Sequence, residues 1–183
     1  MQLLGLPFTS IPSEIKEIFD ENAECETVVR ELAVKNVCAV VESQKNNMPP
    51  WVLGADTLIT IDAKICGKPL DRNDAGNMLR SFSGREHKVW SAIALYNGRK
   101  KTIDCRSVSS AVSFAPLSGE EIEWYLNSGE WQGAAGAYRI QGLASCLISG
   151  ISGSYSSVVG LPLRELYVML KDNRYYIPSP PGG

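Results

Sequence analysis

The sequence predicts one domain in which helices cover a mixed β-sheet, of the α/β or α+β class. Its length of 183 residues suits a single domain with a proper core. Its 44% hydrophobic and 21% charged residues are ordinary globular values, which argue against collagen-like repeats, coiled coil and global disorder. Segments with helical periodicity alternate with strand-like segments, some of which are joined by hairpin signals.

The first half of the chain is expected to alternate helix and strand. The predicted elements are a helix over 26–43, a polar loop over 44–50, a strand over 51–61, a turn at 62–64 into residues 65–66, and a helix over 71–82. Both helices carry apolar residues at the spacing of one helical face, and Asp71 is a suitable N-cap for the second. The strand is apolar at nearly every position, as a strand buried on both faces would be.

The second half is expected to begin with a hairpin. The predicted elements are strands over 88–96 and 101–114, a helix over 118–126, a strand over 143–151 and a helix over 162–171. Asn97-Gly98 is a strong signal for a two-residue hairpin between the two strands. Ser118 and Glu121 have capping-box spacing at the start of the helix. We expect the domain to span 1–174 and the Pro/Gly-rich end, 175–183, to be a disordered tail.

Charge and cysteine content narrow the classes of function. Eighteen basic and 20 acidic residues give a net charge of −2, so no basic excess favours nucleic-acid or membrane-surface partners. No apolar run approaches the ~20 residues of a membrane span, and the first residues do not resemble a signal peptide. The five cysteines are scattered without a CxxC pair, which argues against disulfides and structural zinc and predicts small, buried thiols in a cytoplasmic protein.

Asp56 is the most informative single residue, because it interrupts an apolar strand. A lone carboxylate is costly to bury, so it requires a cation, a metal or hydrogen-bond donors. Gly54 and Ala55 are expected to leave space beside it for another molecule. The alternative is a structural aspartate that pairs with a lysine or with backbone N–H groups.

Lys68 follows the predicted turn and precedes Pro69, which restrains it. Across a hairpin, this lysine could share a site with Asp56, and the pair would suit the neutralisation of phosphate charge. The alternative is a solvated turn lysine.

Two glycine-dense segments, 129–142 and 150–157, could bring backbone close to a ligand, although ordinary tight turns are an equal alternative. The Gln141 amide could read a base edge, since it both donates and accepts hydrogen bonds. The second segment could cradle anions near a helix start. Neither segment fits G-x-G-x-x-G or a Walker loop, so a Rossmann or P-loop fold is not expected.

The single histidine, His87, lies in a polar turn, where a surface or supporting role is expected more than a catalytic one. With one histidine and no G-x-S-x-G motif, a Ser-His-Asp hydrolase has little support. Several carboxylates could offer hard oxygen ligands to Mg²⁺ or Mn²⁺ beside a phosphorylated substrate. These are Glu14, Glu17, Asp20, Glu21, Asp56 and Asp62.

Six short motifs in this order resemble the Maf family of nucleoside triphosphate pyrophosphatases, over residues 4–170. The motifs are Gly54-Ala-Asp-Thr57, Gly67-Lys-Pro69, Ala75 with Met78-Leu79, Ser83-Gly84 with His87-Lys-Val89, Gly136-Ala-Tyr138 with Ile140-Gln-Gly142, and Gly153-Ser-Tyr155 with Val158-Val-Gly-Leu-Pro162. The resemblance implies an elongated domain, a mixed sheet around a central cleft, and a possible homodimer. It implies hydrolysis of a nucleoside triphosphate to the monophosphate and pyrophosphate with a divalent metal, Mg²⁺ or Mn²⁺.

The resemblance also assigns roles. Asp56 matches the family's proton acceptor and a metal ligand, Glu17 matches an acidic residue that helps with metal or water, and Lys68 matches the site lysine. The Asp56-Thr57 pair and Gln141 resemble the residues of the subgroup that prefers dTTP and UTP. In that subgroup's pattern, hydrogen bonds from Thr57 and Gln141 would recognise the uracil or thymine ring.

The sequence departs from the family pattern at three places. It begins after the position where a Ser-x-Ser-Pro-Arg-Arg motif is expected, and Asn36 and Ala134 stand where lysines are usual. These losses predict an electrostatic deficit at a triphosphate site. Two alternatives therefore stand beside the active dTTP/UTP enzyme: a weakly active or inactive nucleotide-binding or regulatory protein on the same scaffold, and an ITP-type housecleaning pyrophosphatase.

Overall fold

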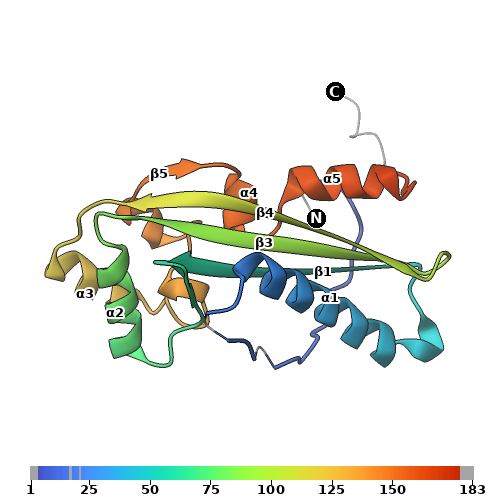
Figure 1. The fold of residues 1–183 in the computed structure, drawn as a ribbon, viewed down its shortest axis with the longest axis horizontal. Coiled ribbons are helices and arrows are strands. Elements are labelled where there is room, and N and C mark those ends of the chain that lie inside the picture. The colour runs from blue at the N-terminus through green and yellow to red at the C-terminus, as the bar shows by residue number, and fades with distance from the viewer. Residues whose placement is uncertain (1–3, 17, 21, 178–183) are drawn as a thin grey trace.

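The structure is a computed structural model that describes residues 4–16, 18–20 and 22–177. In chain order, its α-helices and strands are α1 (Cys25–Ser43), β1 (Trp51–Ile61), β2 (Lys64–Cys66), α2 (Arg72–Phe82), β3 (Glu86–Asn97), β4 (Thr102–Phe114), α3 (Gly119–Ser128), β5 (Ile148–Ser152), α4 (Tyr155–Val159) and α5 (Leu163–Asp172). The long strands β1, β3 and β4 run along the long axis of the molecule, and α2 and α3 lie at one end (Figure 1). The predicted α/β class is confirmed.

The helix signals in the sequence correspond to real caps. The Asp71 side chain accepts a hydrogen bond from the Asp74 N–H and begins α2. Ser118 and Glu121 form a complete capping box at the start of α3. These caps satisfy backbone N–H groups that have no partner within the helix, which is why each helix begins where local chemistry predicts.

The prediction of a mixed sheet is wrong. The described strands form one five-stranded sheet in the order β2-β1-β3-β4-β5, and each neighbouring pair is antiparallel. The turn after β1 reverses the chain into β2, and α2 then carries it to the other side of β1, where β3 begins. β2 and β3 therefore point the same way but are separated by β1, so this helical crossover creates no parallel ladder.

Two local predictions require correction. Residues 143–151 were expected to form one strand, but Leu143–Leu147 is a 3₁₀-helix that turns Ala144 and Leu147 into the core. Only Ile148–Ser152 pairs with β4. The prediction failed because a short apolar run does not by itself distinguish a strand from a helical turn. The β3–β4 hairpin forms as predicted, but its loop has four residues, 98–101, and not two. The Asn97 carbonyl oxygen accepts a hydrogen bond from the Lys101 N–H.

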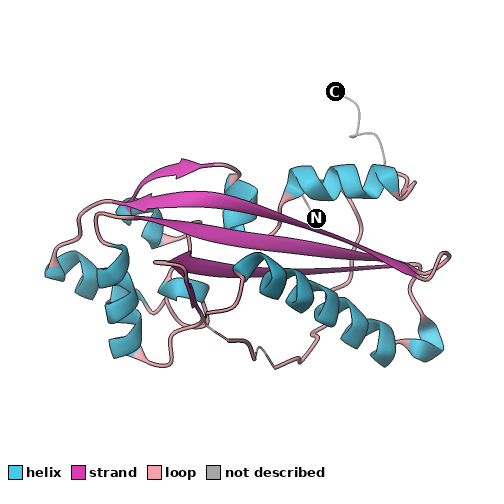
Figure 2. Ribbon diagram, in the orientation of Figure 1, coloured by secondary structure: helices cyan, strands magenta, loops and turns pink. Residues whose placement is uncertain are grey.

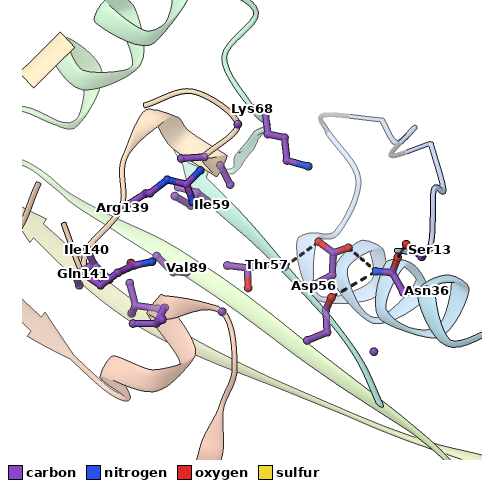
Figure 3. A pocket seen from close by; sticks show the side chains of 18 of the residues that line it. Ser13, Asn36, Asp56, Thr57, Ile59, Lys68, Val89, Arg139, Ile140 and Gln141 are labelled. Carbon is purple, nitrogen blue, oxygen red and sulfur yellow. Dashed lines mark hydrogen bonds between the residues drawn. The ribbon is translucent and has the colours of Figure 1, made fainter. Parts of the chain in front are cut away.

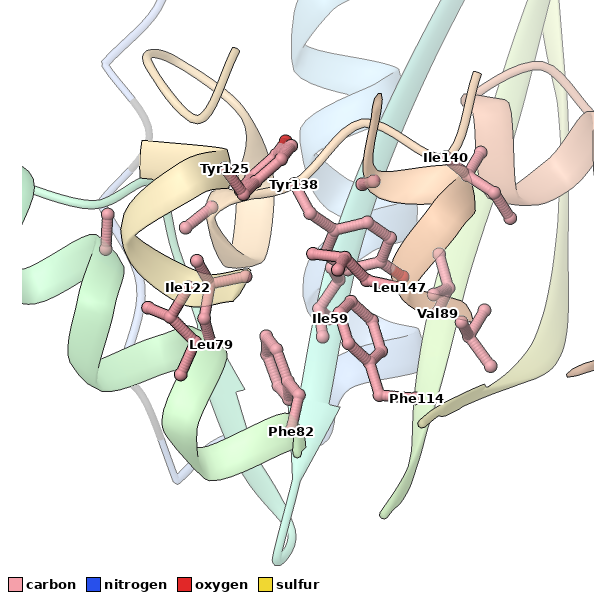
Figure 4. Packing of buried hydrophobic residues seen from close by; sticks show 14 of the residues in the cluster. Ile59, Leu79, Phe82, Val89, Phe114, Ile122, Tyr125, Tyr138, Ile140 and Leu147 are labelled. Carbon is pink, nitrogen blue, oxygen red and sulfur yellow. The ribbon is translucent and has the colours of Figure 1, made fainter. Parts of the chain in front are cut away.

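Helices cover both faces of the sheet (Figure 2). Alternate residues of β3 face opposite sides: Ala92 and Ala94 pack with α1, whereas Ile93 and Leu95 pack with α5. A third cluster joins the sheet to α2 and α3 around Phe82, which is fully buried (Figure 4). The sheet thus lies between two hydrophobic layers over this part of its length.

Gly54 brings α1 unusually close to β1. A Cβ atom at this position would lie 2.8 Å from both the Ala33 carbonyl oxygen and Val37 Cγ2. The sequence suggested that this glycine leaves room for another molecule. The structure corrects this, since the helix itself occupies the space beside the glycine.

The C-terminal end of the described chain packs against the domain. Tyr175 makes an edge contact with Trp51 at a centroid distance of 5.5 Å, and Ile177 borders the cluster beneath α5. The remainder of the predicted tail, 178–183, lies outside the described residues. No helix in the described ranges has both the length and the apolarity needed to cross a bilayer.

The cysteine prediction holds only in part. Cys25 is buried, but Cys38 and Cys146 are exposed, because these two lie on the outer sides of α1 and the 3₁₀-helix.

Candidate active site

A cleft of about 540 Å³ lies between β1, the N-terminal segment, residues 133–141 and the end of α4. Four of the residues singled out by the sequence line it: Asp56, Thr57, Lys68 and Gln141 (Figure 3). The volume is in the range of small-molecule sites. The expected central cleft is therefore present, and it gathers side chains from segments that are far apart in the sequence.

Asp56 is half-buried and is held by neutral donors. The Asn36 side-chain amide donates to Asp56 Oδ2 at 3.1 Å, and the Thr57 backbone N–H donates to Oδ1 at 2.8 Å. Ser13 Oγ donates to Asn36 Oδ1 at 2.5 Å. This bond fixes the amide orientation, so that its NH₂ group faces the carboxylate (Figure 3).

Lys68 is exposed at the rim of the same cleft, beyond the end of β2. Its segment is tied to the far wall, because the Gly136 N–H donates to the Gly67 carbonyl oxygen at 2.9 Å. Asp56 and Lys68 thus share one site across the β1–β2 turn, as the sequence predicted. A carboxylate and an ammonium group in one cleft can serve a phosphate-containing ligand.

Arg139 is a cleft residue that sequence reasoning missed. Its guanidinium donates to the carbonyl oxygens of Glu130 at 3.1 Å and Gln132 at 3.0 Å. These bonds hold the glycine-dense segment 129–142 in one conformation against the cleft. Its position two residues before Gln141 is the one sequence feature that could have indicated a cleft residue. Nothing else in the local sequence distinguishes Arg139 from the other arginines.

A chain of hydroxyl groups runs from the cleft into the core. Thr57 Oγ1 lies 2.8 Å from Ser91 Oγ, and Ser91 Oγ donates to the Ser157 carbonyl oxygen at 2.6 Å. Ser157 Oγ in turn lies 2.8 Å from Ser110 Oγ. Ser91, Ser110 and Ser157 are all buried. The chain connects β1, β3, α4 and β4, which are adjacent only in the folded protein.

The structure corrects the expectation of a surface position for His87, which is buried in an aromatic cluster with Phe82, Phe114 and Tyr138 and does not itself line the cleft. Its Nε2 lies 2.8 Å from the Tyr138 hydroxyl. Burial lowers the pKa of His87 from 6.5 to about 4. The polar residues before His87 form the turn that precedes β3. Alternate residues of β3 face opposite sides of the sheet, and His87 is on the side that faces the core.

The candidate metal ligands do not all converge. Glu17 and Glu21 lie outside the described residues. Asp62 does not line the cleft and forms an ion pair with Arg85, with an N–O distance of 2.5 Å. Among the described residues, no group of three or more His, Cys, Asp or Glu side chains is placed to hold a metal. Asp56 is the carboxylate that the described part of the chain contributes to the cleft lining.

Both internal departures from the family pattern fall on the cleft. Asn36 and Ala134 line it, so uncharged side chains stand at two positions where lysines were expected. Lys35 does not replace Asn36, because it lies on the exposed side of α1 and pairs with Glu31 at 3.6 Å.

Comparisons with known proteins agree with the architecture. A sequence profile of the family described as Maf-like protein matches residues 1–173. A dTTP/UTP pyrophosphatase of Hydrogenovibrio crunogenus is 41% identical over 94% of this chain and 88% of its own length. A dTTP/UTP pyrophosphatase of Symbiobacterium thermophilum is 39% identical over 97% and 89%. A nucleoside triphosphate pyrophosphatase of Xylella fastidiosa is 39% identical over 93% and 89%.

Proposed function

The chain belongs to the Maf-like protein family, and from this premise we propose that it hydrolyses a nucleoside triphosphate to the monophosphate and pyrophosphate, with dTTP and UTP as preferred substrates. One observation carries the proposal. A single cleft combines a carboxylate at Asp56, a cation at Lys68, and hydrogen-bonding groups at Thr57 and Gln141. Lys68 suits the charge of the phosphates, Asp56 suits a general base or metal ligand beside them, and Thr57 and Gln141 suit a pyrimidine base.

Asp56 is proposed to orient and deprotonate the water that attacks the α-phosphorus. A general base must lie within hydrogen-bond reach of the water whose proton it takes, so its position must be fixed. The donors from Asn36 and Thr57 fix the carboxylate from two sides. Lys68 would stabilise the negative charge that builds on the phosphate oxygens as pyrophosphate leaves.

The donor set fits a divalent metal bound together with substrate. Mg²⁺ commonly takes one or two protein carboxylates and completes its shell with phosphate oxygens and water. Asp56 would supply the first carboxylate and Glu17 is the proposed second, although Glu17 lies outside the described residues. The metal would neutralise phosphate charge and lower the barrier to attack.

Asn36 and Ala134 favour one alternative, a weakly active nucleotide-binding protein on the same scaffold. Each removes a positive charge from the cleft relative to the expected pattern, and a triphosphate carries several negative charges. Lys68 and Arg139 are the cations that the described residues retain in the cleft lining. The alternative therefore predicts nucleotide binding with slow turnover.

The test is pyrophosphate release by the 183-residue chain with Mg²⁺ or Mn²⁺, from dTTP, UTP, CTP, GTP and ITP. We expect release mainly from dTTP and UTP, and Asp56→Asn should lower kcat by about 100-fold or more, in the range for loss of a general base. Asp62→Asn is the matched control, since Asp62 is exposed and outside the cleft.

Three results would count against the proposal. Release mainly from ITP would indicate the housecleaning activity, and binding without release would support the weakly active alternative. Unchanged turnover in Asp56→Asn would remove Asp56 from the mechanism.

A further inference from the structure

The hydroxyl chain behind the cleft determines which hydrogen bonds Thr57 can make. Each hydroxyl group has one hydrogen to donate. The Ser157 carbonyl oxygen can only accept, so the 2.6 Å contact from Ser91 uses the Ser91 hydrogen. Ser91 must then accept in its 2.8 Å contact with Thr57, and Thr57 is the donor there.

Thr57 is left with lone pairs and no hydrogen for the cleft. Thr57 is half-buried and lines the cleft, whereas Ser91 is fully buried behind it. Gly160 borders the same hydroxyl, since a Cβ there would lie in van der Waals contact with Thr57 Oγ1 at 3.5 Å, and its φ of +115° strains other residues. A ligand group that forms a hydrogen bond with Thr57 Oγ1 must therefore donate the hydrogen.

We infer that Ser91 is a positioning residue that determines base specificity, because it makes the Thr57 hydroxyl an obligate acceptor for the N3–H of uracil or thymine. This inference rests on the proposed function and deepens it. Cytosine presents a lone pair at N3, which would meet the lone pairs of Thr57. Phosphate oxygens are acceptors too, so this hydroxyl suits the base better than the phosphates.

A sugar hydroxyl is the other donor that a nucleotide offers. The proposed substrates include a ribonucleotide and a deoxyribonucleotide, so a shared donor would be N3–H or the 3′-hydroxyl. Figure 3 shows Thr57 between Gln141 and Asp56 in this view. Gln141 is the other proposed base-reading side chain, and it lines the same cleft, so we assign the donor to the base.

The test measures equilibrium binding of α,β-methylene UTP and α,β-methylene CTP by calorimetry, which is independent of turnover. The unmodified chain should prefer the UTP analogue. Ser91→Ala should reduce this preference about fivefold to tenfold, mainly through tighter binding of the CTP analogue, because Thr57 can then rotate and donate to N3. Ser110→Ala removes another buried hydroxyl of the chain but not the Ser91–Thr57 contact, so it should keep the preference.

Equal weakening of both analogues in Ser91→Ala would overturn the inference, because a merely structural role lowers both affinities together. An unchanged preference, or an equal change in Ser110→Ala, would overturn it as well. Binding of neither analogue to the unmodified chain would instead overturn the proposed function, and the inference with it.

Modified nucleotides give a test that needs no substitution, should Ser91→Ala fail to fold. On the unmodified chain, the N3-methyl derivative of α,β-methylene UTP should lose at least tenfold in affinity, whereas its 3′-deoxy derivative should bind as α,β-methylene UTP does. The reverse pattern would assign the donor to the sugar and overturn the base assignment.

Discussion

The Asn36 amide is oriented by its neighbours on both sides. Ser13 donates to its oxygen, so its NH₂ group is directed at Asp56. The residue is thus a neutral support for the carboxylate, at a position where a lysine was expected. A change of charge at this position should therefore alter the conditions under which Asp56 is ionised.

We predict that charge at position 36 shifts the pH profile of kcat/KM. Asn36→Asp places a second carboxylate beside Asp56, which disfavours its ionised form, so the acidic limb should move to higher pH by about one unit. Asn36→Lys should move the same limb to lower pH. The measurement is pyrophosphate release across pH 4–8.

Lys35→Gln provides the matched control, since it also lowers the net charge by one but lies on the exposed side of α1. A profile that moves equally in Lys35→Gln and Asn36→Asp would show that net charge, rather than contact with Asp56, causes the shift.

At the scale of elements, the packing of α1 on β1 sets the geometry of the site. Asn36 on the helix reaches Asp56 on the strand because Gly54 allows the two backbones to approach. A side chain at residue 54 would have to displace the Ala33 carbonyl and Val37. Stability and site geometry are therefore coupled through one glycine.

We predict that Gly54→Ala lowers the free energy of unfolding by about 1–3 kcal/mol, as overpacking does, and also lowers kcat. Gly119→Ala is the control, because no atom lies within 4 Å of a Cβ at that helical position. Urea unfolding monitored by circular dichroism would measure both variants. Wild-type stability in Gly54→Ala would mean that α1 can move without cost.

At the scale of the whole molecule, an aromatic cluster connects the sheet to the wall of the cleft. His87 on β3 lies 4.4 Å from Phe82 on α2 between ring centroids, and it contacts Tyr138 in the cleft segment. Burial keeps the pKa of His87 low, so the side chain is neutral in the folded protein at neutral pH. Protonation of this residue therefore favours unfolding.

We predict that the free energy of unfolding falls as the pH is lowered from 6.5 to 4, because His87 then takes up a proton on unfolding. Burial disfavours the charged ring and lowers the pKa of His87 from 6.5, the value for an exposed histidine, to about 4 in the folded protein. Its contribution is fully present above pH 6.5 and is lost as pH falls towards 4, by up to about 3 kcal/mol. Urea unfolding of the wild type and His87→Phe across pH 4–7.5 would measure it.

Carboxylates titrate in both proteins, so the difference between the two pH profiles isolates the histidine. His87→Phe should show a shallower loss of stability between pH 6.5 and 4. Parallel curves would contradict the prediction.

The sequence by itself determined features that depend on neighbours along the chain. The caps at Asp71 and Ser118 and the hairpin signal at Asn97 act over three or four residues, so they were predicted directly. Asp56 and Lys68 could be paired because a single tight turn joins the two segments that carry them. The chemical roles of Asp56, Thr57, Lys68, Gln141 and Glu17 stay predictions.

Only the tertiary structure decided features that depend on contacts between distant segments. The antiparallel order of the sheet follows from where α2 crosses β1, and the burial of His87 follows from the register of β3. Gly54 meets α1, and Ser91 meets both Thr57 and Ser157, through packing that no local pattern encodes. Whether Thr57 donates or accepts in the cleft is likewise decided by tertiary structure, because the partners that take the hydroxyl hydrogens of Thr57 and Ser91 lie on other elements.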